Sequence, residues 1–140
     1  MIAIIRIRGR VKIPEEVKNT LYRLRLRHKY TCVILHEKPE TLGMLKMIRD
    51  FVSYGKIDKS TLKKLLEKRG VIIDKKKKVD FEKLSEEIFN AKVDKKMQTY
   101  NLKPFFRLHP PRGGIKSKLH YPKGVLGENK EINKLIERML

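Results

Sequence analysis

The chain has 140 residues, enough for one domain, or a small domain with an insert, that folds without metal or disulfide support. Its 35 Lys and Arg against 16 Asp and Glu give a net charge of +19, which attracts polyanions and makes nucleic acid the expected partner. Cys32 is the only cysteine, so an internal disulfide is excluded, and we expect it to be a buried apolar filler. No apolar run reaches the length of a membrane span, so we expect a soluble intracellular protein with no membrane partner.

The first 13 residues predict a strand. They are rich in β-branched residues and then alternate, with Ile5 and Ile7 apolar and Arg6 and Arg8 basic. This alternation predicts one wet, cationic face in the second half of the strand. Gly9 is expected to end it.

A helix is expected next, over residues 14 to about 25. A proline and two glutamates suit its positive first turn, and its far end is basic. Val17, Leu21 and Leu24 would share its buried face. The Leu-Arg alternation over residues 24–27 is equally typical of a strand, so two readings compete there.

A strand over residues 30–37 and a helix over residues 38–55 are expected to follow. The strand is nearly all apolar and therefore central in its sheet. In the helix, Gly55 is expected to be the C-terminal stop. Helical spacing holds at Leu42, Leu45, Ile48 and Val52. The order so far is β-α-β-α.

Residues 56–102 differ in character and predict an inserted helical subdomain. Asp58 and Asp80 each precede a short amphipathic helix, and a short apolar strand is expected between the two helices. This strand leads into Lys75–Lys78, which is either a phosphate contact or a solvated hairpin tip; both readings stay open.

The stretch FRLHPPRGGIKSKLHYPKG, residues 106–124, carries five Lys and Arg and no acid. It is too irregular for a strand or helix and too apolar for a disordered tail. Gly113 and Gly114 would let backbone approach phosphates, and Pro110-Pro111 would stiffen the segment. Such segments fit the crevices of a folded RNA. The closing EINKLIERML predicts an amphipathic helix.

Motifs for catalysis, metal binding and nucleotide cofactors are absent from the sequence. The four histidines lack ligand spacing, and neither a nucleophile motif nor a phosphate-binding loop occurs. We therefore expect no enzyme, no metal, no cofactor and no small-molecule substrate. An RNA-processing enzyme that uses His28 or His109 as acid–base groups is the weakest of the open alternatives. RNA is favoured over duplex DNA because no helix-turn-helix, zinc-finger or basic-zipper signature is found.

Three segments carry a family resemblance. They are TLYRLRLRHKYTCVI, GMLKMIRDFVSYGKID, and FRLHPPRGGIKS followed by LG and EINKLIERM. With these segments, the chain resembles the large-subunit ribosomal protein L-thirty family in its archaeal form, whose eukaryotic members are called L-seven. The likeness covers nearly the whole chain and implies an archaeal source. One departure is Arg25, where bacterial members commonly have glycine.

The resemblance implies an α+β fold. Its ferredoxin-like β-α-β-α-β core would have an antiparallel sheet with the helices on one face, a small helical insert and a C-terminal helix. The core with its basic extension would comprise residues 1–55 and 103–140, the insert residues 56–102, and the last strand residues 104–108. Phe106 and Leu108 should pack inward.

The resemblance also implies a structural, non-catalytic component of the large ribosomal subunit in the cytoplasm, with ribosomal RNA and neighbouring ribosomal proteins as partners. The alternative is a free-standing RNA-binding regulator or RNA chaperone of the same fold. Basic residues near the first strand and helix, and basic residues and two glycines in the last motif, would contact RNA. They are Arg8, Arg10, Lys12, Arg23, Arg27, His28, Lys29, Arg107, His109, Arg112, Gly113, Gly114, Lys116 and Lys118.

Overall fold

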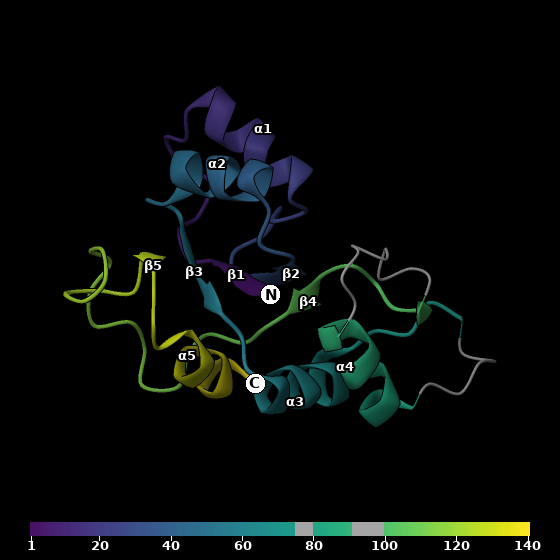
Figure 1. Ribbon diagram of the computed structural model, residues 1–140. Coiled ribbons are helices and arrows are strands. Elements are labelled where there is room, and N and C mark those ends of the chain that lie inside the picture. The colour runs from purple at the N-terminus through teal and green to yellow at the C-terminus, as the bar shows by residue number, and fades with distance from the viewer. Residues whose placement is uncertain (75–79, 91–99) are drawn as a thin grey trace.

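The computed structural model describes residues 1–74, 80–90 and 100–140 of the chain (Figure 1). It is an α+β fold, as expected, and its first five elements form a β-α-β-α-β unit. The elements are β1 (Ile2–Arg6), α1 (Glu15–Arg23), β2 (Thr31–Leu35), α2 (Pro39–Ile48), β3 (Val52–Lys56), α3 (Lys59–Arg69), α4 (Phe81–Asn90), β4 (Phe106–Arg107), β5 (Gly127–Glu128) and α5 (Ile132–Met139).

The strands form a sheet in the order β4-β2-β1-β3-β5. β1 lies in the middle and pairs antiparallel with both β2 and β3, while β4 pairs antiparallel with β2. Only the short β5 runs parallel to its neighbour, β3. Every residue of β1 is buried, which is typical of a strand covered on both faces.

Helices cover both faces of this sheet (Figure 1). Ile2 and Ile4 of β1 pack in one apolar cluster with α1 and α2, the two helices of the β-α-β-α-β unit. Ala3 and Ile5 point the other way and join a second cluster with α3, α4 and α5. The period-two alternation of β1 therefore supplies the centre of both cores, and each fully buried Ile stabilises the fold by about 1.5–3 kcal/mol.

The prediction of a single helix over residues 38–55 is wrong for the second half of that range. α2 ends at Ile48, and the chain turns at Phe51 into β3. Gly55 lies inside this strand, where a Cβ atom would come within 2.3 Å of the Asn129 carbonyl oxygen. Its glycine is explained by this close approach of backbone and not by a helix end. The third strand of the core is consequently β3, and the strand expected at residues 104–108 is the short edge strand β4.

Other expected elements are confirmed or shortened. The helical reading after residue 14 is confirmed, and residues 24–27 form no strand. The strand expected after Gly70 is reduced to one bridge between Ile72 and Leu102. Asp80 caps α4 by accepting a hydrogen bond from Glu82 N at 3.2 Å. Lys75–Lys78 lie outside the described residues. The division into a core and an insert stays a prediction, although α3 and α4 share one cluster with the sheet.

Arg6 corrects the expected cationic face of the first strand. Its side chain is only 2% exposed, whereas Arg8 beyond the end of β1 is exposed. The Arg6 guanidinium donates to the carbonyl oxygens of Leu26 (2.7 Å), Arg27 (3.0 Å), Arg8 (3.1 Å) and Gly9 (2.8 Å). Burial, and secondly the nearby Arg10 charge, lower the pKa of Arg6. This buried cation therefore fastens the end of β1 to the segment that follows α1.

The burial expected for three residues of β2 and of the β4 segment is also confirmed. Phe106 and Leu108 are buried, and Cys32 is a buried free thiol. Among the described residues, no helix has the length and apolar character that crossing a membrane requires.

Replacing Arg6 by Leu should lower the free energy of unfolding by about 3 kcal/mol, because several part-buried carbonyls lose their donor. Arg6→Lys should recover only part of this loss, since one ammonium group cannot reach four separate carbonyls. Urea unfolding followed by circular dichroism measures the effect. Arg23→Ala, at the exposed end of α1, is the control and should change stability by less than about 0.5 kcal/mol. Similar losses in Arg6→Leu and the control would contradict the role given to Arg6.

Cys32 should be almost unreactive toward iodoacetamide at about pH 8 in the folded protein and reactive in urea, because the thiolate is the nucleophile. Burial raises the pKa of Cys32 from 9.0 to about 12. The protonated thiol therefore favours the folded state fully below about pH 9, and this contribution is lost as the pH rises toward 12. Mass spectrometry of the alkylated chain measures the rates; equal rates in the two states would refute this burial.

Candidate nucleic-acid interface

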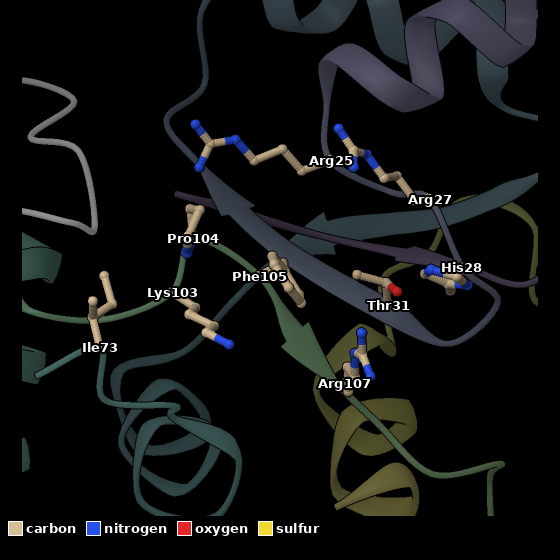
Figure 2. Close-up of a pocket in the computed structure, with 9 residues that line it drawn as sticks. All are labelled: Arg25, Arg27, His28, Thr31, Ile73, Lys103, Pro104, Phe105 and Arg107. Atoms are coloured by element: carbon tan, nitrogen blue, oxygen red, sulfur yellow. The ribbon is translucent and has the colours of Figure 1, made fainter. Parts of the chain in front are cut away.

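An open pocket lies at the edge of the sheet where β4 meets β2 (Figure 2). Its volume is about 590 Å³. It is lined by side chains from the segment after α1, from the start of β2, and from the chain that enters β4. They are Arg25, Arg27, His28, Thr31, Ile73, Lys103, Pro104, Phe105 and Arg107.

The segment after α1 presents its arginines because the leucines between them are buried. Leu24 and Leu26 are 6% and 0% exposed, and Leu26 N donates to the Leu21 carbonyl at 2.8 Å. Arg25 and Arg27 are left on the outside. Arg25 has a φ of +61°, in the left-handed region that favours glycine. Arg25 therefore holds a backbone conformation that residues with a Cβ atom rarely adopt.

Strand pairing brings a distant basic residue to the same place. β4 pairs with β2 so that Arg107 lies opposite Thr31, and Phe106 lies opposite Cys32. Leu108 N also donates to the Tyr30 carbonyl at 3.0 Å. Because side chains alternate across a strand, Phe106 is buried while Arg107 is exposed. Arg27 and His28 therefore share one pocket with Arg107, although about 80 residues of chain separate them.

The pocket is strongly cationic. Four of its nine described lining residues are Lys or Arg, and none of the nine is acidic. Three further lining residues, Ile73, Pro104 and Phe105, are apolar. The Arg107 Cζ lies 5.9 Å from the centroid of the Phe105 ring, which is within cation–π range. Such a pocket presents positive charge beside an aromatic surface, and an anion bound there would relieve the mutual repulsion of the cations.

Further basic residues adjoin the pocket. Arg10 donates to the Arg27 carbonyl (3.1 Å from Nε and 2.9 Å from Nη2), and its Nη2 lies 3.1 Å from His28 Nδ1. Lys29 Nζ lies 4.7 Å from the centroid of the Tyr30 ring. The loop and helix residues Lys12 and Arg23 are exposed but do not line the pocket.

The segment after β4 forms a second basic surface, anchored on the end of α5. His109 N and Arg112 N donate to the carbonyls of Met139 and Arg138, each at 3.0 Å. The Arg138 guanidinium donates back to the carbonyls of Arg112 (2.8 Å) and Gly114 (2.7 Å). These bonds hold the Arg112 turn against the helix and leave the Arg112 side chain exposed.

Two glycines shape that turn. Gly113 and Gly114 have φ values of +77° and +70°, which a residue with a Cβ rarely adopts. His109, Lys116 and Lys118 are exposed along the same segment. The Lys118 carbonyl accepts a hydrogen bond of 3.4 Å from Arg8 Nη2, so the second basic surface reaches back to the end of β1.

Sequence reasoning missed seven residues of these surfaces: Arg25, Thr31, Ile73, Lys103, Pro104, Phe105 and Arg138. Arg25 belongs to the Leu-Arg alternation, so that pattern was a usable signal. Lys103 and Phe105 immediately precede β4, and only its pairing with β2 reveals their position. Within residues 1–74, 80–90 and 100–140, no group of three or more His, Cys, Asp and Glu side chains could hold a metal ion.

Comparisons with known proteins place the chain in a family. The family model described as "Ribosomal protein L30p/L7e" matches residues 2–52. A protein of Archaeoglobus fulgidus named "Large ribosomal subunit protein uL30" is 41% identical, with 99% of each chain covered. Proteins of the same name from Pyrobaculum islandicum and Aeropyrum pernix are 38% and 37% identical, covering 99% of this chain and 93% and 98% of their own lengths. The resemblance found in the sequence is confirmed: the chain belongs to the ribosomal protein L30p/L7e family.

Proposed function

We propose that this chain is a structural component of the large ribosomal subunit, in the cytoplasm, and that it binds ribosomal RNA there beside other ribosomal proteins. The observation that carries the proposal is the acid-free cationic pocket formed where β2 and β4 pair. The relatives from Archaeoglobus fulgidus and Pyrobaculum islandicum are named as large ribosomal subunit proteins, which supports this choice of particle. No catalytic role is proposed.

The distribution of charge supports one RNA-facing side. Acidic residues of the α3–α5 layer pair with lysines: Lys59 with Glu86 at 2.9 Å, and Lys64 with Glu137 at 2.6 Å. Lys63 of α3 pairs in the same way with Glu82 of α4. The arginines around the pocket instead donate to backbone carbonyls or lie over aromatic rings, which leaves their charge uncompensated. Uncompensated arginine is what phosphate groups recognise.

The proposed RNA contacts fall on the two basic surfaces and the exposed chain beside them. We assign Arg27, His28 and Arg107 to the pocket, with Arg8, Arg10, Lys12, Arg23 and Lys29 around it. The second surface would contribute the side chains and turn backbone of the segment after β4. These are His109, Arg112, Gly113, Gly114, Lys116 and Lys118.

Co-sedimentation separates this function from a free-standing RNA regulator or chaperone of the same fold. The native chain should travel quantitatively with large subunits through a sucrose gradient in moderate salt, because many phosphate contacts act together. Quantitative immunoblotting of the gradient fractions measures this. Recovery mainly in the slowly sedimenting soluble fractions would favour the regulator and overturn the ribosomal assignment.

Arg107→Ala and Arg112→Ala should each weaken binding to large-subunit RNA and make it less dependent on salt. Each lost phosphate contact should reduce the slope of log affinity against log salt by about 0.7–0.9. Fluorescence anisotropy over a salt series measures the slope. Lys134→Ala is a matched control, because it removes one positive charge from α5 that is paired with Glu131 at 2.7 Å. Slopes equal to that of the control would mean that these arginines contact no phosphate.

A further inference from the structure

We infer that the pocket at the β2–β4 edge receives a single unpaired nucleotide, with its base inserted beside Phe105 and its phosphates held by the surrounding arginines. The inference rests on the proposed function, since the nucleotide would belong to the bound RNA. It goes further by assigning the base of one nucleotide to the apolar lining residues and its phosphates to the cationic ones.

The size and shape of the pocket fit one nucleotide. Its volume of about 590 Å³ lies in the range of small-molecule sites, which is roughly 300–1,000 Å³. A convex surface would be enough for the backbone of a paired helix. A hollow of this volume at a sheet edge has room for a base that has left its stack.

The apolar and the cationic lining residues match the two chemical parts of a nucleotide. Phe105, Pro104 and Ile73 offer an apolar surface that includes an aromatic ring. Figure 2 shows the Phe105 ring near the middle of the pocket, with Arg25 and Arg27 on one side of it and Arg107 on the other. A base can stack on a phenylalanine ring or a guanidinium plane, and the same guanidinium groups hold phosphate through their N–H donors.

Two of the four lining cations lie over aromatic rings before any ligand binds. Arg107 lies over the Phe105 ring, and Arg27 lies over the Tyr22 ring with its Cζ 5.5 Å from the centroid. The carbonyl of Arg27 is fixed by donors from both Arg6 and Arg10. Side chains that are already oriented lose less conformational entropy on binding, which favours a defined nucleotide position over diffuse attraction.

A bound acidic peptide is the competing occupant. Carboxylates would also neutralise the arginines, but they offer nothing to the aromatic and apolar lining residues. A nucleotide can contact the apolar residues with its base and the arginines with its phosphates. The arrangement therefore favours RNA, and it predicts that affinity depends on the base itself as well as on the phosphate charge.

The test compares two hairpin RNAs that carry the same phosphates. One has a single bulged adenosine, and the other has an abasic ribose at that position. The full-length protein should bind the adenosine bulge about tenfold more tightly, as expected for one base stacked on an aromatic ring. Phe105→Leu keeps apolar volume but removes the ring, so it should reduce this preference to nearly one with the salt slope unchanged. Phe89→Leu, at the exposed Phe89 of α4, is the control and should keep the preference.

The outcomes separate the inference from the proposed function. Equal affinity of the wild-type protein for both hairpins, with salt-dependent binding to large-subunit RNA retained, overturns the nucleotide pocket alone. Failure to bind either hairpin or large-subunit RNA overturns the proposed function as well. Stronger competition by an oligoglutamate peptide than by the abasic hairpin would assign the pocket to an acidic protein partner. Thermal melting of each variant checks that the fold is intact.

Discussion

The buried guanidinium of Arg6 is the interaction on which the side of this protein proposed to contact RNA depends. It lies at the end of the central strand and donates to the carbonyls of Leu26 and Arg27 on one side and of Arg8 and Gly9 on the other. A buried charge is costly unless its donors are satisfied. Satisfying it here requires two separate loops to converge, and Arg25 and Arg27 of the pocket lie in one of them. The strand thus positions cations that it does not itself contribute.

The alternation of side chains along extended backbone determines which residues are buried and which are exposed. In β1 it divides the apolar residues between two cores, and in β4 it buries Phe106 while exposing Arg107. After α1, the buried Leu24 and Leu26 give the same result without a strand. In β4 and after α1, the apolar residues are buried and the basic residues next to them are exposed. Core packing and the proposed RNA contacts therefore use alternating positions of the same short segments.

Much of this could be predicted from the sequence, and the failures have a common cause. The amphipathic helices and the buried Phe106 follow from local periodicity, which needs no knowledge of partners. β3 was missed because Val52 continues the helical spacing of α2, and only tertiary pairing with β1 selects the strand. Arg6 was misplaced because alternation says which residues share a face but not which face is covered. The position of Phe105 in the pocket likewise depends on the pairing of β4 with β2, which are distant in the sequence.

The net charge of +19 says less about the binding surface than the positions of the cations that have no acidic partner. Hydrogen bonds from Lys59 and Lys64 lower the pKa values of Glu86 and Glu137, so these ionised carboxylates each compensate one lysine of α3. Around the pocket, the arginines are bonded to carbonyls and rings that carry no net charge. The ion pairs among the described residues involve none of the residues that line the pocket. The uncompensated charge at the β2–β4 edge therefore favours the approach of a polyanion to that edge.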